Sequence, residues 1–269
     1  MPALYNWGAR ALYIGPALGL SAHRNAVAVL AVGLDAQFAL ATAPADPDSP
    51  LRSCRSALIP PSTLHRLVSK RGRMAFLYVD AASRDLERLA TRVQEPTERA
   101  GFDLTCEARL IELLDDLHAR RITLTHAREA LETEVLATLG RELPNALTKA
   151  IEYLNTHAGE RPSLGALASM AGLSESRFRH LFVAATGTTL RRYRSWAAMG
   201  VALRSMAKGI SLTDAAYEGG FSSSAHFSAA FREMFGMEPS RLARLGLTRT
   251  SLSGRADVSP EARGTRPRP

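Results

Sequence analysis

The sequence predicts an α+β protein, with a small β sandwich or barrel first, helices after it, and an all-α C-terminal part. Short apolar runs alternate with turn-rich segments through residues 10–80. From about residue 83 the apolar residues recur at i, i+3 and i+4, which is helical spacing. In the C-terminal half, one such helical pattern is repeated. A chain of 269 residues has room for roughly two domains.

The N-terminal strands are expected where apolar residues cluster between turn residues. These runs are 26–34, 36–42, 54–60 and 74–80. The turn-rich segments between them are 43–50, 60–62 and 69–73. Short strands at this spacing are typical of a small sandwich or barrel.

Three amphipathic helices are expected next, at 83–93, 107–119 and 125–140. Gly140 and Pro144 then indicate a boundary, because both residues interrupt helices. The expected division of the chain is 1–82 for the β domain, 83–143 for a helical dimerisation or linker region, 144–247 for the all-α domain, and 248–269 for a disordered basic tail rich in Pro, Gly, Ser and Arg.

Composition narrows the function classes. No run of 18 apolar residues and no signal-peptide pattern occur, so we expect a cytoplasmic protein without a membrane partner. Cys54 and Cys106 are too few for a metal or disulfide framework and are expected as buried free thiols. Residues 1–144 carry 17 Lys+Arg and 17 Asp+Glu, whereas residues 145–269 carry 17 and 9. The whole net charge of +8 thus lies in the C-terminal part, which favours either a polyanionic partner or a solvated basic surface.

The repeat in the C-terminal half predicts two helix-turn-helix units. Residues 164–182 align with residues 212–231, 48 positions later. Ala168 and Ala216 are the small residues that let the second helix of each unit cross the first. One unit alone is weak evidence for DNA binding, because many helix corners share this pattern, but two units in one basic domain favour it.

Each unit has a turn glycine followed by a serine. Gly172 and Gly220 lie where the turn requires a positive φ. Ser174 and Ser222 follow as expected N-caps of the second helices. The aromatic patterns of the two units are offset by one residue, and we expect this offset to lie inside the second helix, with the turns alike.

A single helix is expected to join the two units, at 189–207, and would span roughly 28 Å. That length approaches one turn of B-DNA, about 34–36 Å, so the chain could present two helices to one side of a duplex. Arg191, Arg192 and Arg194 at its start either face phosphate or form a solvated surface.

At residues 145–245 the chain resembles the AraC/XylS family of bacterial transcription regulators. The resemblance rests on two stretches, SLGALASMAGLSESRFRHLFVAATGTTLRRYR and SLTDAAYEGGFSSSAHFSAAFREMFGMEPSRLAR. The second is similar to the family signature through its Gly-Phe-Ser start, its phenylalanines at 227, 231 and 235, and the following Gly236 and Pro239.

The resemblance implies which residues contact DNA. In the first unit they are Ser174, Ser176, Arg177, Arg179 and His180. In the second unit they are Ser222, Ser223, Ser224, Ala225, His226, Ser228 and Ala229. Arg179 is expected to matter most, since a guanidinium bonds guanine O6 and N7 together. The corresponding helix of the second unit departs from the family pattern, because its Ser and Ala side chains form few hydrogen bonds with base edges. We expect it to contact thymine methyl groups and the DNA backbone. His226 either contacts DNA or packs.

The N-terminal part resembles, more loosely, the cupin-like sensing domain of some family members. The matching pieces are AHRNAVAVLAVGLDAQFAL, SALIPPSTLHRL and MAFLYVDAASRD. His23 and His65 either line an effector pocket or serve as core or turn residues. No Glu lies between residues 11 and 86, so we expect neither a metal site nor a cofactor. The three helices either form a dimer contact or cover the sheet.

These features predict a sequence-specific DNA-binding transcription regulator rather than an enzyme. Activation is the expected direction, and repression stays open because the direction depends on where the site lies relative to a promoter. Its expected partners are double-stranded DNA, RNA polymerase, a small-molecule effector and a second copy of the chain. Two alternatives stay open. One is a cupin-type metalloenzyme with a helical appendage, and the other is a nonspecific nucleic-acid-binding protein that relies on charge alone.

Overall fold

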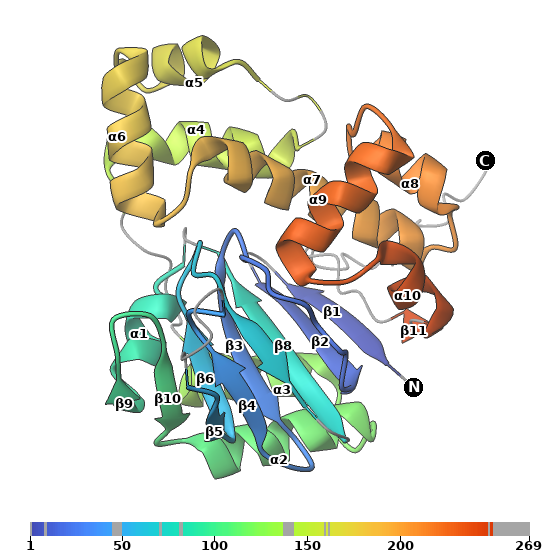
Figure 1. Cartoon of the computed structure of the whole chain (residues 1–269). Coiled ribbons are helices and arrows are strands. Elements are labelled where there is room, and N and C mark those ends of the chain that lie inside the picture. The colour runs from blue at the N-terminus through green and yellow to red at the C-terminus, as the bar shows by residue number, and fades with distance from the viewer. Residues whose placement is uncertain are drawn as a thin grey trace, which may run out of the picture.

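The computed structural model describes residues 2–7, 10–44, 50–69, 72–80, 83–136, 143–158, 160, 162–246 and 248–249 (Figure 1). Its strands are β1 (Ala3–Trp7), β2 (Arg10–Pro16), β3 (Ala28–Gly33), β4 (Phe38–Ala41), β5 (Arg52–Cys54), β6 (Ser56–Ile59), β7 (Arg66–Val68), β8 (Arg73–Val79), β9 (Val93–Pro96), β10 (Gly101–Leu104) and β11 (Thr248–Arg249). Its helices are α1 (Asp85–Ala90), α2 (Glu107–His118), α3 (Leu124–Glu134), α4 (Asn145–Thr156), α5 (Leu164–Met170), α6 (Glu175–Thr186), α7 (Leu190–Ala207), α8 (Leu212–Glu218), α9 (Ser224–Phe235) and α10 (Pro239–Arg244).

The strands form two sheets. The larger has the order β11-β1-β2-β8-β3-β6-β10-β9, and its pairs are antiparallel except for β1 with β11. The smaller has the order β5-β4-β7. In Figure 1 the sheets occupy the lower half, α2 and α3 lie against them, and α4 to α10 lie above. The predicted α+β class is therefore confirmed.

One face of the large sheet packs on α2 and α3. Leu12 of β2 and Leu77 of β8 point to this face and join a core with Leu113 of α2 and Leu131 of α3. The apolar side of α2 is thus buried on the sheet, so the second of the two roles considered for these helices, covering the sheet, is the one observed.

The opposite face of the sheet shares a core with the C-terminal helices. Tyr13 and Phe76, the strand neighbours of residues on the first face, lie here because side chains alternate along a strand. They join one buried cluster with Phe38 of β4 and with Phe231 and Phe235 of α9. The two halves of the chain are therefore packed together through apolar surface.

The four predicted strands are confirmed as β3, β4, β6 and β8. The expected helix at 83–93 is wrong beyond Ala90, because Val93 begins strand β9. β9 pairs with β10, and β10 pairs with β6, so the sheet continues into the region expected to be only helical. Pairing to an existing sheet edge outweighs the helical spacing of this segment.

The remaining boundaries differ in smaller ways. α3 ends at Glu134, and residues 137–142 lie outside the described part. Pro144 immediately precedes α4, as expected for a helix start. Of the tail expected at 248–269, the structure describes only Thr248–Arg249, which pair with β1.

Cys54 is a buried free thiol, whereas Cys106 is only half-buried, which corrects the expectation for the second cysteine. Burial raises the pKa of the Cys54 thiol to about 12. None of the described helices is long and apolar enough to span a bilayer. The described residues also hold no group of three or more His, Cys, Asp or Glu placed to bind a metal ion.

Candidate nucleic-acid interface

The first helix-turn-helix unit consists of α5 and α6. Ala168 is buried where the two helices meet, and its carbonyl accepts a hydrogen bond from the amide of Leu173 at 2.9 Å. Gly172 between them has φ +64°, the left-handed conformation that favours glycine. The Ser174 hydroxyl accepts a bond from the amide of Arg177, which makes Ser174 the N-cap, as predicted.

The second unit, α8 and α9, repeats this turn. Ala216 is buried and accepts the amide of Phe221 at 2.9 Å, and Gly220 has φ +75°. The N-cap of α9 is Ser223, whose hydroxyl accepts the amide of His226 at 3.1 Å. The prediction of Ser222 as the N-cap is therefore wrong.

This N-cap explains the offset between the two units. Ser222 is one extra residue in the turn, and it places α9 one position later relative to its glycine. The second helices of the two units, α6 and α9, are the expected reading helices. Each has 12 residues, and each ends at a glycine with φ +68°, Gly187 and Gly236. The offset thus lies before the second helix and not inside it, and the helices themselves match.

The predicted contact residues of α6 are exposed. They are Ser176, Arg177, Arg179 and His180, together with the N-cap Ser174. The other side of this helix holds Phe178 and Phe182, both fully buried, with Phe182 packed edge-on against Tyr193 of α7. The polar face of α6 is therefore available to a partner, while its aromatic face fixes the helix.

The predicted contact residues of α9 are also at the surface. Ser222, Ser224, Ala225, His226 and Ala229 are exposed, and Ser223 and Ser228 are half-buried. The His226 ring does two things at once, because its Nδ1 lies 3.0 Å from the Ser222 hydroxyl and its ring packs edge-on against Phe221. Phe227, Phe231 and Phe235 form the inward stripe of this helix.

The three arginines at the start of α7 have different surroundings. Arg192 forms an ion pair with Glu233 at the end of α9, with 2.7 Å between nitrogen and oxygen. Arg194 donates to the carbonyl of Pro162 and is half-buried. Arg191 is exposed. Of the three, the exposed Arg191 is thus the one best placed to meet phosphate.

The N-terminal domain is joined to α7 and to the end of α9 by hydrogen bonds. The Tyr193 hydroxyl lies 2.9 Å and 3.0 Å from the carboxylate oxygens of Asp80, at the end of β8. The Asn25 side chain donates to the carbonyl of Met234 in α9 at 2.7 Å. The amide of Ser21 donates to the carbonyl of Gly236 at 2.9 Å. The N-terminal domain therefore contacts both α7, which joins the two units, and the end of α9.

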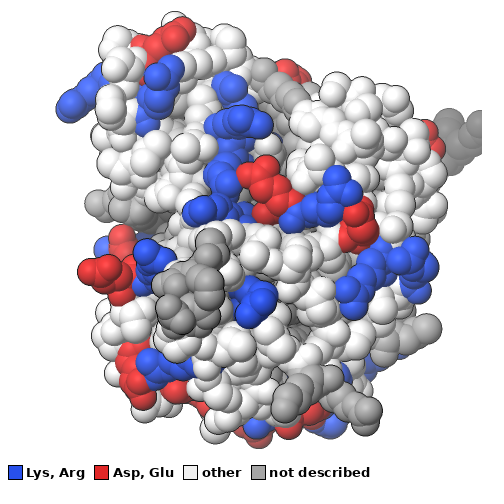
Figure 2. Space-filling model, in the orientation of Figure 1, with Lys and Arg blue, Asp and Glu red and all other residues white. Residues whose placement is uncertain are grey.

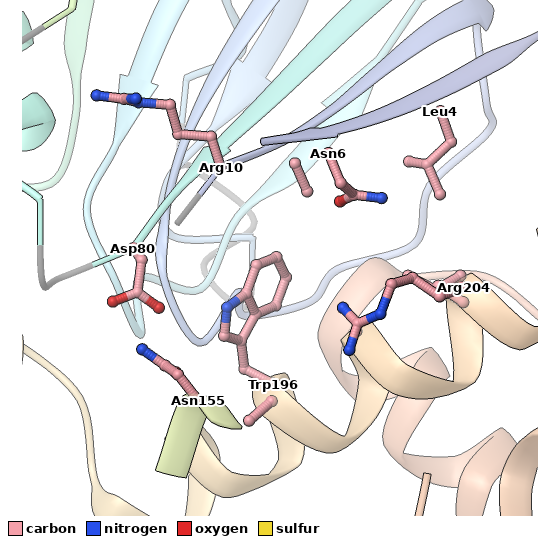
Figure 3. Close-up of a pocket in the computed structure, with 11 residues that line it drawn as sticks. Leu4, Asn6, Arg10, Asp80, Asn155, Trp196 and Arg204 are labelled. Atoms are coloured by element: carbon pink, nitrogen blue, oxygen red, sulfur yellow. The ribbon is translucent and has the colours of Figure 1, made fainter. Parts of the chain in front are cut away.

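A cavity of about 270 Å³ lies between the domains (Figure 3). It is lined by Leu4, Asn6, Arg10, Ala11, Asp80, Asn155, Trp196, Ala197, Gly200, Leu203 and Arg204. Figure 3 shows Trp196 rising from α7, with Asp80 and Asn155 to one side and Arg204 to the other. A smaller apolar cavity shares Leu4, Ala11, Trp196 and Leu203 with it and continues toward Phe231 and Phe235.

The two arginines that line this cavity differ in their ion-pair partners. The Arg10 guanidinium is held by Asp85 at 2.7 Å and by Glu132 at 2.8 Å. No residue in the described part of the chain forms an ion pair with Arg204. The cavity therefore presents one uncompensated cation beside an indole ring and aliphatic side chains.

His23 and His65, the expected effector-pocket residues, do not line this cavity. Their backbones form an isolated β-bridge, and their ring centroids are 4.2 Å apart. Each Nδ1 faces a backbone carbonyl, Ser21 for His23 and Thr63 for His65. Burial lowers the pKa of both imidazoles, that of His65 to about 3. The structure thus shows a buried, neutral pair next to Gly236, the alternative left open for these residues.

The sequence does not predict this interdomain cavity, because the residues that line it come from β1, β2, α4, α7 and the end of β8. No local spacing joins Asp80 to Asn155 or Arg204. A half-buried tryptophan on an amphipathic helix was the one available signal, and it is equally typical of core packing.

Comparisons with known proteins agree with this geometry. A family model described as a helix-turn-helix domain matches residues 167–245, across both units. A probable transcriptional regulator, LumQ of Photobacterium leiognathi, is 34% identical over 90 residues. That match covers 33% of this chain and 36% of LumQ, so the chain spans about a third of that relative.

The whole fold is similar to solved structures of ToxT from Vibrio cholerae. One has a TM-score of 0.60 at 12% identity, covering 88% of this chain and 99% of that one. Another, with an unsaturated fatty acid bound, has a TM-score of 0.58 at 11% identity, covering 91% and 99%. The match across both units identifies residues 167–245 as a helix-turn-helix domain, and the signature residues that carry the AraC/XylS resemblance lie inside it.

Proposed function

We propose that the chain is a sequence-specific DNA-binding transcription regulator that inserts α6 and α9 into two successive major grooves. The observation that carries this proposal is the duplicated unit. Both turns have the same backbone bonds, and both reading helices have 12 residues and expose small or polar side chains. The segment that carries the whole net charge of +8 contains both units, which suits a polyanionic partner.

The two reading helices would contribute differently. Arg179 on α6 is the side chain suited to bonding a guanine through O6 and N7. On α9, Ser224, Ala225 and Ala229 offer few base-edge hydrogen bonds. This helix would contact thymine methyl groups and anchor the protein on the backbone. Arg191, exposed at the start of α7, would add a phosphate contact.

We propose the interdomain cavity as the effector site, in place of the His23–His65 pair. An apolar small molecule with one anionic group fits the lining, because Trp196 and Leu203 offer apolar surface and Arg204 an uncompensated charge. A fatty acid bound to the similarly folded ToxT supports this chemistry. The same cavity touches α7, the helix that joins both reading units, so occupancy would act on their orientation.

RNA polymerase and a second copy of the chain are the proposed protein partners. A regulator that binds beside a promoter acts through contacts with the polymerase, and activation is the direction we propose. The outer polar sides of α2 and α3 stay free for a second copy, since their apolar sides are buried on the sheet.

Selection of bound fragments from the whole genome, with the full-length protein at about 0.15 M salt, tests the proposal. We expect enrichment of a motif with two elements about ten base pairs apart. Salt at this level matters because phosphate contacts alone weaken as counterions compete. Equal recovery of all fragments would instead favour the nonspecific nucleic-acid-binding alternative.

A further inference from the structure

An open groove runs beside the second reading helix, on the face shown in Figure 2. Its volume is about 560 Å³. We call it the interhelix groove, since it is bordered by the start of α7 and by α9. His226 and Ala229, two residues proposed to meet DNA, form part of its wall. A duplex held by α6 and α9 would have to pass over this groove.

Arg24 of the N-terminal domain also lines the interhelix groove. Its backbone amide donates to the carbonyl of Glu233 in α9 at 3.1 Å, which fixes this residue beside the reading helix. Its guanidinium is exposed and donates one bond, to the carbonyl of Ser62 at 3.1 Å. Four of its five N–H donors therefore stay available for an acceptor.

The charges of the interhelix groove favour a phosphate. Arg192 and Glu233 neutralise each other across it. Within the described residues, neither Arg24 nor Arg191 has an ion-pair partner. Two uncompensated cations, one from each domain, thus face one open groove whose acidic residue is already paired. Figure 2 shows a column of basic side chains, with acidic ones beside it, in the upper half of this face.

We infer that Arg24 binds a DNA backbone phosphate, so that the N-terminal domain is itself part of the DNA-binding surface. The inference rests on the proposed function, since it places the duplex on α6 and α9. The phosphate lies between Arg24 and Arg191, next to the bases read by α9. DNA affinity then depends on how the N-terminal domain sits on α9, and not on the helical domain alone.

The salt dependence of DNA affinity tests the inference. Full-length wild type and the variants R24A, R24K, R99A, R179A and R191A are titrated with the selected DNA between about 0.05 and 0.3 M salt. R99A is the matched control, because Arg99 is also exposed in the N-terminal domain and also donates to one loop carbonyl, that of Thr42.

For R24A we expect the slope of log affinity against log salt to fall by about 0.9, the value for one lost phosphate contact. Affinity at 0.15 M salt would fall about fivefold on every DNA sequence, which is the same slope applied to that salt concentration. R24K keeps the charge and most of the slope, whereas R99A matches wild type. Equal thermal unfolding of R24A and R99A shows that folding is not the cause.

The inference is overturned if R24A keeps the wild-type slope while R191A lowers it. DNA then touches the helical domain only, and the proposed function stands. If R24A, R191A and R179A all bind DNA as wild type does, the proposed placement of the duplex fails as well. The two failures are thus distinguished by the same titrations.

Discussion

The hydroxyl of Tyr193 in α7 lies within 3.0 Å of both carboxylate oxygens of Asp80 at the end of β8, and both residues are buried. Burial, together with the Asp80 charge, raises the pKa of the Tyr193 phenol, so this group stays protonated and donates. Asn155 of α4 lies 3.1 Å from the same hydroxyl. One phenol therefore joins the N-terminal domain to α7 and α4.

Replacing Tyr193 by Phe should lower the free energy of unfolding by about 1–3 kcal/mol, because Asp80 loses a donor while remaining buried. Chemical denaturation of the full chain measures this. Tyr153→Phe is the matched control, since its hydroxyl also donates to a carboxylate, Glu160, but at the surface. Equal stability of the two variants would show that the Tyr193–Asp80 contact does not stabilise the fold.

Arg179→Ala should cost about 1–3 kcal/mol of binding free energy, and only on DNA that carries the cognate base. The reason is that a base contact discriminates between sequences, whereas a phosphate contact does not. Binding to the selected site and to the same site with that base changed gives the comparison. An equal loss on both DNAs would assign Arg179 to the backbone.

Ser223→Ala should destabilise the fold by about 0.5–2 kcal/mol, the usual effect of removing an N-cap. Ser222→Ala should cost less, because its hydroxyl bonds only the exposed His226 ring and no backbone amide of α9. Thermal unfolding of the two variants shows which serine is the N-cap of α9. A larger loss for Ser222→Ala would make Ser222 the N-cap, as expected from the sequence.

Gly172→Ala and Gly200→Ala should shift stability in opposite directions. Gly172 has φ +64°, so a Cβ there adds roughly 1–2 kcal/mol of strain although the space is open. Gly200 lies inside α7, and a Cβ would meet only the flexible end of Arg204 at 3.3 Å. Alanine there favours the helix by up to about 1 kcal/mol. Denaturation curves test both, and a stabilised Gly172→Ala would contradict the turn geometry.

Stability should fall as the pH drops below about 6.5. The folded-state pKa of His65 is lowered to about 3 and that of His23 is also lowered, in each case mainly by burial. The unfolded chain therefore binds protons first, and the contribution of His65 is lost between about pH 6.5 and pH 3, at up to about 1.4 kcal/mol per pH unit. A His65→Gln variant should show a shallower pH dependence. An unchanged slope would mean that His65 is solvated.

The features that the sequence predicted are those encoded by short spacings. Gly172 and Gly220, the buried Ala168 and Ala216, and the phenylalanine stripe of α9 each depend on neighbours within one helix or turn. The N-cap of α9 was assigned one residue too early, because Ser222 and Ser223 are chemically equal and only backbone geometry distinguishes them.

The features that could not be predicted depend on tertiary contacts. β9 and β10 form because β6 offers a sheet edge to pair with, although the spacing up to Val93 is helical. Asp80, Asn155 and Arg204 meet in one cavity only after the domains have packed. Arg24 has no neighbour in sequence that suggests DNA, and only its bond to Glu233 places it beside α9.

A hydroxyl-radical footprint of the full-length protein on its selected DNA fragment tests the central claim most directly. If α6 and α9 read one side of the duplex, two protected windows should appear about ten base pairs apart. A single window, or protection spread evenly along the fragment, would contradict the claim that both helices enter successive major grooves.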